Sequence, residues 1–320
     1  MPFYLLSGAG FSRNWGGILA PEMFNQLIGS SLIDDELRRM LWRDRSFEDV
    51  LAALQSAGDE EGKRRYRLLV SEIVGIFNGM TQSFERRAFE FKQPPDTRYS
   101  VASFLARFDA LFTLNQDTLL EQKYLPFVSD NKWGRADTPG MKHLSSFVPS
   151  GAIQDRYAVR EPNASNFQIS PGIQPYLKLH GSCNWVDGTA GERILIMGGQ
   201  KAVRIDHFPV LSWYHQEFRT RLRQPGAKLM VIGYSFGDAH INGAILDAIK
   251  QGPLKIFLVD RDGDKVLDKR NHRATILMPP DELMELVQSR LNGISTRPLD
   301  TTFSDDTVEH DNLTRFFQQA

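Results

Sequence analysis

The sequence predicts an α/β protein with a Rossmann-like, doubly wound and mainly parallel sheet that carries a helical insertion. Three observations predict this class. Short apolar runs of strand length recur along the chain, helical patterns separate them, and most of the runs end in glycines and polar residues. Because the runs lie too far apart for hairpins, we expect parallel strands joined by crossover helices.

The predicted strands cover residues 3–6, 110–114, 176–179, 193–197, 228–232 and 256–259. Each is a short apolar run bounded by turn-forming residues. Helices are predicted at about 101–108, from Ile241 onward and at 281–291, and Asp238 is well placed to cap the second of these. All of these elements fall within one domain of residues 1–295, followed by a polar C-terminal tail at 296–320.

A helical insertion is predicted at about residues 19–97. Ser46 is placed as an N-cap for a helix whose apolar residues share one face. From Tyr66 to Phe84 apolar residues recur every three or four positions, which is typical of one long helix or two end-to-end helices. The stretch of about residues 126–175 is rich in Gly, Pro, Ser and Asn and is predicted to be a long surface loop.

The composition excludes several classes of protein. Its 320 residues carry 38 Lys and Arg against 39 Asp and Glu, so the charge does not favour binding to nucleic acid. The single cysteine excludes a disulfide framework and a four-thiolate zinc site. Because no apolar run approaches the roughly 20 residues that span a bilayer, we expect a soluble cytoplasmic protein with no membrane partner.

The strand ends carry the candidate functional residues, because doubly wound sheets bind ligands at their carboxyl edge. Gly8 and Gly10 let backbone amides approach a pyrophosphate, or they only form a tight turn. Asn115 and Asp117 could orient ribose hydroxyls or a water molecule, or serve in an Asx turn and a helix cap. His180 could be a general base or a structural histidine.

Residues 233–237 also fit the Gly-x-Ser-x-Gly nucleophile elbow of a serine hydrolase. Ser235 would then be the nucleophile, with Asp260 or Asp262 as the acid and His272 as the base. This alternative leaves the Gly8 and Asn115 clusters without a role.

Four motifs, taken in order, resemble those of the sirtuin-like superfamily. They are Gly8-Ala9-Gly10-Phe11-Ser12, Thr113-Leu114-Asn115-Gln116-Asp117, His180-Gly181 and Gly233-Tyr234-Ser235. Residues 46–51 and 233–242 look most like the divergent prokaryotic branch, many of whose members are NAD hydrolases of antiphage defence.

The resemblance implies that NAD+ is bound as the substrate, without a metal. The phosphates would be held by Gly8, Ala9, Gly10 and Ser12, with Thr113 also in the binding set. Gly233 and Ser235 would hold the adenosine side and Asp260 the adenine ribose. The catalytic residues around the nicotinamide ribose would be Asn115, Asp117 and His180. Cys183 alone cannot make the zinc module of two cysteine pairs, which argues against protein deacylation.

The implied activity is an NAD+ hydrolase that releases nicotinamide and ADP-ribose as a regulated antiphage effector. A non-catalytic sensor of NAD or ADP-ribose and a zinc-free deacylase are alternatives. Because an unregulated NAD hydrolase would poison its own cell, we expect a homo-oligomer or an activating partner. By the resemblance, that partner would be an ATPase of the DNA-translocase type or a phage component.

Overall fold

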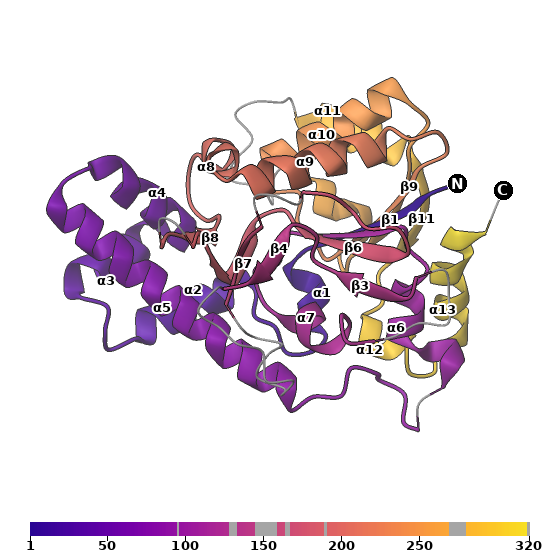
Figure 1. Ribbon diagram of the computed structural model, residues 1–320, viewed down its shortest axis with the longest axis horizontal. Helices are drawn as coiled ribbons and strands as arrows, with labels where there is room; N and C mark the ends of the chain where they lie inside the picture. The colour runs from indigo at the N-terminus through magenta and orange to yellow at the C-terminus, as the bar shows by residue number, and fades with distance from the viewer. Residues whose placement is uncertain are drawn as a thin grey trace.

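A seven-stranded parallel sheet crosses the molecule and has helices on both faces (Figure 1). The computed structural model describes residues 1–94, 96–127, 133–144, 159–163, 167–188, 191–268 and 280–318. The strand order is β11-β10-β9-β1-β2-β6-β3, and every neighbouring pair is parallel. The strands are β1 (Phe3–Ser7), β2 (Ala110–Thr113), β3 (Arg135–Asp137), β6 (Ile173–Lys178), β9 (Lys228–Ile232), β10 (Lys255–Val259) and β11 (Leu291–Ser295). The predicted Rossmann-like class is confirmed.

Side chains alternate between the two faces of each central strand, so two separate cores form. Tyr4 and Leu6 pack against α9 (Pro209–Leu222), α10 (Ala239–Gln251) and α11 (Pro280–Gln288). Leu5 lies on the opposite face. There the core includes α1 (Ala9–Arg13), α6 (Val101–Leu105), α7 (Leu119–Lys123), α12 (Leu299–Thr302) and α13 (Thr307–Thr314). Burial on both faces explains why these strands read as continuous apolar runs.

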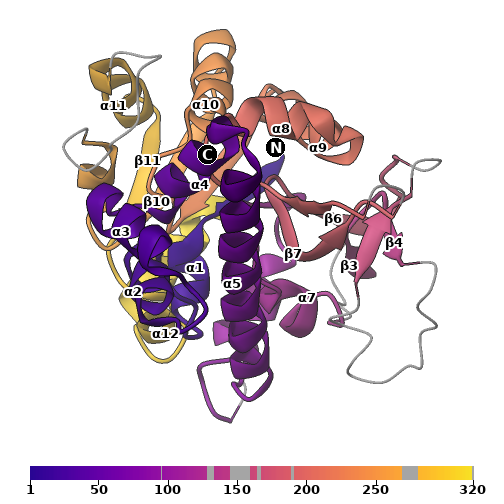
Figure 2. The same cartoon turned by 90° about the vertical axis from the view of Figure 1, so that its left-hand side faces the viewer.

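The predicted helical insertion forms a layer beside the sheet. It comprises α2 (Ala20–Gly29), α3 (Asp35–Asp44), α4 (Phe47–Ala57) and α5 (Glu60–Glu85), which share a third apolar core. The Ser46 hydroxyl accepts the Asp49 amide at 3.2 Å and starts α4, as predicted. The pattern from Tyr66 to Phe84 lies on one long helix, α5, which crosses in front of the sheet in Figure 2. In the described part of the chain, no helix is both long and apolar enough to cross a membrane.

A second, smaller sheet differs from the prediction. The strand predicted at 193–197 is β8 (Arg193–Leu195), and it pairs antiparallel with β7 (Gly181–Val186) outside the main sheet. The order of this sheet is β4-β5-β7-β8, with β4 (Met141–His143) and β5 (Arg160–Pro162). The predicted loop at 126–175 thus contains the strands β3, β4 and β5, whereas residues 128–132, 145–158 and 164–166 lie outside the described residues.

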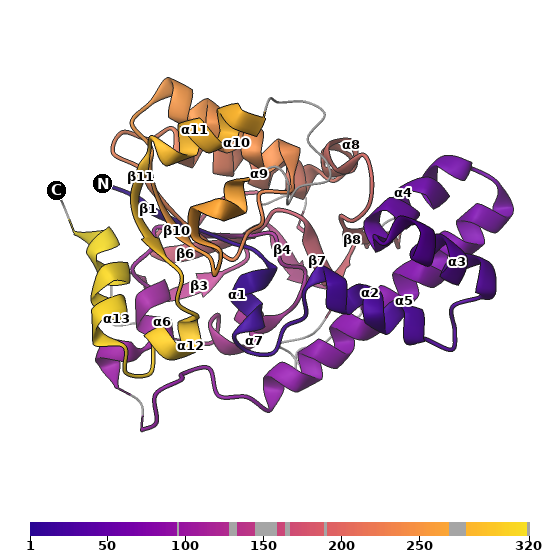
Figure 3. The same ribbon diagram turned by 180° about the vertical axis from the view of Figure 1, so that it is seen from behind.

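The segment 296–318 is not a polar tail, as the sequence had suggested. After β11, which the sequence did not predict, it forms α12, α13 and a 3-10 turn at Arg315–Phe317. Phe303 and Phe316 are 0% and 1% exposed and belong to the core beneath the sheet, on the side of α1 and α6 (Figure 3). Sparse apolar residues with wide spacing conceal this role in the sequence, because each short helix buries only one or two side chains.

Candidate active site

Five adjacent strands bring the predicted site residues to one edge of the sheet. In the order β10-β9-β1-β2-β6, the strands are followed within two residues by Asp260, Gly233, Gly8, Asn115 and His180. Parallel strands share a carboxyl edge, so these loops face the same side of the molecule. The helical layer lies at this edge in Figure 1, on the side toward which β1 runs.

The two glycine loops lie against each other. The Gly8 amide donates to the Ile232 carbonyl at 3.0 Å, and the Gly10 amide donates to the Gly233 carbonyl at 3.0 Å. A Cβ on Gly10 would lie 2.7 Å from the Gly233 Cα, and Gly233 itself has a φ of +61°. The glycines therefore allow close backbone approach, but their own amides are already engaged within the protein. The expectation that these two amides grip a pyrophosphate therefore needs correction, whereas phosphate binding by the rest of the Gly8–Ser12 turn stays a prediction.

Asn115 is tied to the first glycine turn. Its side-chain amide donates to the Ser12 hydroxyl at 2.9 Å. Its backbone amide donates to the Thr113 hydroxyl at 3.0 Å, and that hydroxyl also accepts from Ser7 at 2.9 Å. Thr113 is only 1% exposed. Thr113 thus fixes the backbone of the loop from within the core, while Asn115 ties the loop to Ser12 of the first glycine turn.

Asp117 lies behind the same loop. Its carboxylate accepts the Leu119 amide at 2.9 Å, which is the Asx turn that the sequence left open. It is 5% exposed, and burial raises its pKa. Lys178 donates to the Asp117 carbonyl and forms a buried ion pair with Glu121 at 2.5 Å. These contacts hold the loop in place, and a direct role for Asp117 at the ribose stays a prediction.

His180 lies in the two-residue turn between β6 and β7 and is 4% exposed. Its Nε2 lies 2.9 Å from the Nε2 of His240, at the first turn of α10. Burial lowers the pKa of His180 well below the usual value of 6.5, so the imidazole is neutral at physiological pH. A neutral imidazole can accept a proton.

His240 lies near a group of charged residues that begins with Asp238. Asp238 does not cap α10 through its side chain, contrary to the prediction. Its carboxylate instead accepts from Lys201 at 2.7 Å, and Lys201 also pairs with Glu48 of the helical layer at 2.9 Å. The two ion pairs keep the pKa of Lys201 above its ordinary value despite burial.

Neighbouring strand-end loops contact one another along the sheet edge. Gly10 contacts Gly233, His180 contacts His240 in the β9–α10 segment, and the Cys183 amide donates to the Gln116 carbonyl at 2.9 Å. With the contact from Asn115 to Ser12, these contacts connect the four chain segments that carry the predicted motifs. The first glycine turn and the imidazole therefore lie on the same side of the molecule.

Comparison with known families agrees with this arrangement. The model of the SIR2-like domain family matches residues 109–278, which is more than half of the chain. The chain belongs to the SIR2-like domain family. No curated protein matches it.

SIR2-like domains use NAD+, so the carboxyl edge of the sheet is the candidate dinucleotide-binding site of this SIR2-like domain. The matched region contains Asn115, His180, Gly233 and Asp260. The Gly8–Ser12 turn lies before it in sequence, but it packs directly on Gly233.

The predicted adenosine side lies at the ends of β9 and β10. Ser235 is exposed, and the Gly233 amide donates to the Val259 carbonyl at 2.9 Å, next to Asp260. The Asp260 carboxylate accepts the Asp262 amide at 2.9 Å. These residues adjoin the glycine turn, and their contact with an adenosine stays a prediction.

The nucleophile-elbow alternative fits the geometry less well. In such an elbow the serine sits at the sharp turn from strand to helix. Here α10 begins at Ala239, after three residues that follow Ser235, and the non-glycine residue of this loop with positive φ is Phe236 instead of the serine. His272, the base of that alternative, lies outside the described residues.

Sequence reasoning missed the residues that surround His180. His240 lies in the motif at 233–242, but the motif assigned it no function. Lys201 and His215 belong to no motif that would indicate a functional role. His215 contacts the Leu179 carbonyl at 2.9 Å through Nε2, and burial lowers its pKa to about 3. The pairing of Glu48 with Lys201 joins residues 153 positions apart, which no local pattern predicts.

One group of side chains has the composition of a metal site. His180, Asp238 and His240 offer ligand atoms within 4.8 Å of one another. The Asp238 carboxylate, however, is already paired with the Lys201 ammonium at 2.7 Å, so a metal ion would have to compete with Lys201 for it. Burial raises the pKa of Cys183 to about 12, so this thiol is protonated and a poor ligand.

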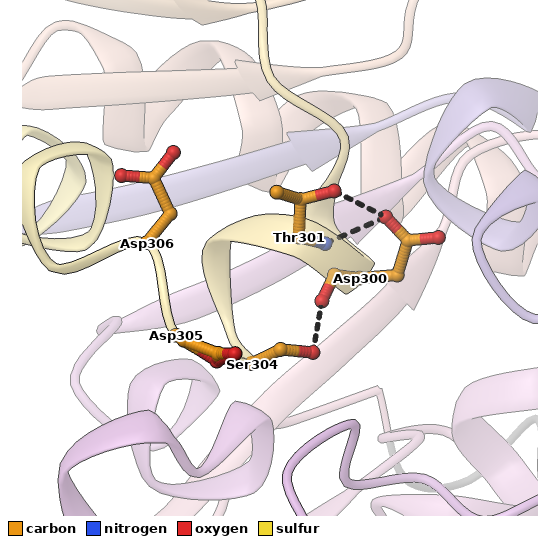
Figure 4. A pocket seen from close by; sticks show the side chains of 5 residues that line it. All are labelled: Asp300, Thr301, Ser304, Asp305 and Asp306. Carbon is orange, nitrogen blue, oxygen red and sulfur yellow. Dashed lines mark hydrogen bonds between the residues drawn. The ribbon is translucent and has the colours of Figure 1, made fainter.

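An open pocket lies elsewhere, on the C-terminal segment (Figure 4). It is lined by Asp300, Thr301, Ser304, Asp305 and Asp306, and none of the predicted site residues lines it. The Asp300 carboxylate accepts the Thr301 amide at 2.6 Å, and the Asp306 carboxylate accepts the Glu309 amide at 3.0 Å. These carboxylates stabilise a local turn and the start of α13. The candidate active site therefore stays at the carboxyl edge of the sheet.

Proposed function

We propose that this SIR2-like domain is an NAD+ hydrolase that cleaves the N-glycosidic bond between nicotinamide and ribose. The observation that supports the proposal is a buried, neutral His180 at the same sheet edge as Asn115 and the two glycine turns. NAD+ is the substrate class of the family.

The leaving group determines what the protein must supply. Nicotinamide departs from a positively charged ring and takes the electron pair of the C–N bond, so it needs no acid. The ribose carbon becomes an oxocarbenium-like centre, and water must reach it. The protein therefore has to hold the ribose, orient a water molecule and accept one proton.

His180 and Asn115 meet these needs in our proposal. His180 accepts a proton from water or from a ribose hydroxyl, while the Asn115 amide, held by Ser12, positions the water. Water adds its oxygen to the ribose carbon, and the proton leaves through His180 to solvent. The products are nicotinamide, ADP-ribose and one proton.

The direct test is nicotinamide release by the purified full chain, measured by chromatography after incubation with NAD+. We expect His180→Ala to lose about 10²- to 10⁴-fold in rate, which is the usual contribution of a general base. Asn115→Ala should lose about 10²-fold, since the attacking water is no longer positioned. His207→Ala is the matched control, because that histidine has a side chain 66% exposed and pairs with Glu192, which is not among the predicted site residues. Thermal unfolding of each variant checks that it is folded.

Three outcomes would contradict the proposal. Full turnover by both alanine variants would remove these residues from the mechanism. Tight binding of NAD+ without turnover would favour a sensor. A strict need for an acylated peptide would favour a deacylase.

We also propose that the enzyme depletes NAD+ in antiphage defence and is held inactive until triggered. The support is the resemblance of residues 46–51 and 233–242 to the divergent prokaryotic branch. Self-assembly, an ATPase or a phage component would supply the trigger. Mass measurement in solution with and without NAD+ tests self-assembly, and a monomer in both conditions would contradict it.

A further inference from the structure

We infer that His240 and Asp238 are positioning residues that fix the working tautomer of His180, and that Glu48 of the helical layer steadies them through Lys201. The inference rests on the proposed role of His180 as the proton acceptor.

The contact between the two histidines determines which nitrogen of His180 is free. Their Nε2 atoms lie 2.9 Å apart, so one of the two donates and the other accepts. When His180 has taken a proton, both of its nitrogens carry hydrogen, and its Nε2 must then donate to His240. If Nε2–H of neutral His180 already donates to His240, the same hydrogen bond is kept in the neutral and the protonated state, and the ring need not rotate. Nδ1 is then the nitrogen that accepts the proton.

Asp238 supplies the negative charge for the protonated state. Its carboxylate lies within 4.8 Å of a nitrogen of each imidazole. Burial alone would raise the pKa of Asp238, but Lys201 and the neighbouring histidines lower it, so the carboxylate is ionised. The charge of Asp238 favours the protonated imidazole of His180, and its effect on the pKa of that group exceeds the opposing effect of Lys201.

Lys201 links this group to the helical layer. Its ammonium lies 2.7 Å from Asp238 and 2.9 Å from Glu48, and the side chains of Lys201 and Asp238 are each 17% exposed. The Glu48 side chain is 40% exposed and lies at the start of α4. Glu48 therefore restrains Lys201 from the side of the helical insertion. A shift of α4 would move Lys201 and so change its ion pair with Asp238.

The tautomer of His180 can be read without any activity. We would label the histidines of the full chain with 15N and record the imidazole nitrogens by NMR, assigning His180 with the His180→Gln variant. The wild type should show His180 with its proton on Nε2. His240→Phe should lose this preference, because the acceptor is gone.

Kinetics provide the second readout. Asp238→Asn keeps the shape of the side chain but removes its charge, and it should lower kcat about 10- to 100-fold with KM unchanged. Glu48→Gln should lower kcat roughly two- to fivefold, since a partly exposed ion pair contributes little. The neighbouring exposed carboxylate gives the matched control, and Asp49→Asn should match the wild type.

The outcomes separate this inference from the proposed function. If the wild type hydrolyses NAD+ but His240→Phe and Asp238→Asn retain both the tautomer and kcat, the positioning role is wrong and the hydrolase stands. If the wild type does not hydrolyse NAD+ and yet the tautomer changes in His240→Phe, the positioning role stands and the hydrolase is wrong.

Discussion

At His180, burial determines the charge of the imidazole. Asp238 would raise its pKa, whereas desolvation, Lys201, His240 and His215 lower it, and desolvation is the largest effect. The site thus holds a base that stays neutral well below pH 6.5. Binding a positively charged nicotinamide nearby would lower the pKa further, because like charges disfavour the protonated form.

We therefore predict that kcat/KM for NAD+ has no acid limb near pH 6.5. Only the neutral form of His180 accepts a proton, and this form persists as the pH falls until its lowered pKa is reached. Initial rates measured from about pH 8 to about pH 5 would test this. A tenfold loss per pH unit beginning near 6.5 would show that His180 titrates normally and is not desolvated as described.

At the scale of elements, two strand–loop–helix units depend on bare backbone for their contact. The turn between β1 and α1 and the loop between β9 and α10 approach so closely that neither Gly10 nor Gly233 has room for a Cβ. The obstructing atoms are backbone, which cannot rotate away. The relative position of the predicted phosphate and adenosine sides is therefore set by glycine.

We predict that Gly10→Ala destabilises the protein by about 1–3 kcal/mol and weakens NAD+ binding, since its Cβ would lie 2.7 Å from the Gly233 Cα. Gly75→Ala, in the middle of α5, is the control. Nothing lies within 4 Å of its added Cβ, and alanine should stabilise the helix by about 0.5–1 kcal/mol. Urea unfolding and calorimetry measure the two effects, and equal behaviour of the two variants would contradict the close approach.

At the scale of the whole molecule, the C-terminal segment completes the core beneath the sheet. Phe303 and Phe316 join the cluster formed by α1, α6 and the lower face of the strands. Lys228 at the start of β9 also donates to the Gln318 carbonyl at 2.8 Å. The segment is therefore part of the globular unit around the sheet.

Truncation of one of these aromatics should be costly. Phe303 is 0% exposed, and Phe303→Ala should lower the free energy of unfolding by about 3–5 kcal/mol. Val308 in the same segment is 80% exposed, and Val308→Ala should change it by less than about 0.5 kcal/mol. If both variants unfold at the same urea concentration, the segment does not pack as described.

The sequence by itself determined the strands with continuous apolar runs and the residues that end them. Runs such as 228–232 are recognisable because central parallel strands are buried on both faces. Gly8, Asn115, His180 and Gly233 follow such runs, and a doubly wound sheet brings strand ends to one edge. Ser46 and the helix from Tyr66 to Phe84 were likewise predictable, since capping and helical periodicity are local properties.

Only the tertiary structure decided what each of these residues touches. The amides of Gly8 and Gly10 are engaged by a loop more than 200 residues away, and Glu48 reaches His180 only through Lys201, Asp238 and His240. The membership of β8 in a separate sheet and the burial of Phe303 are equally non-local. Hydrogen bonds, ion pairs and packing depend on distance in space, whereas periodicity along the chain reports only which face of an element is apolar.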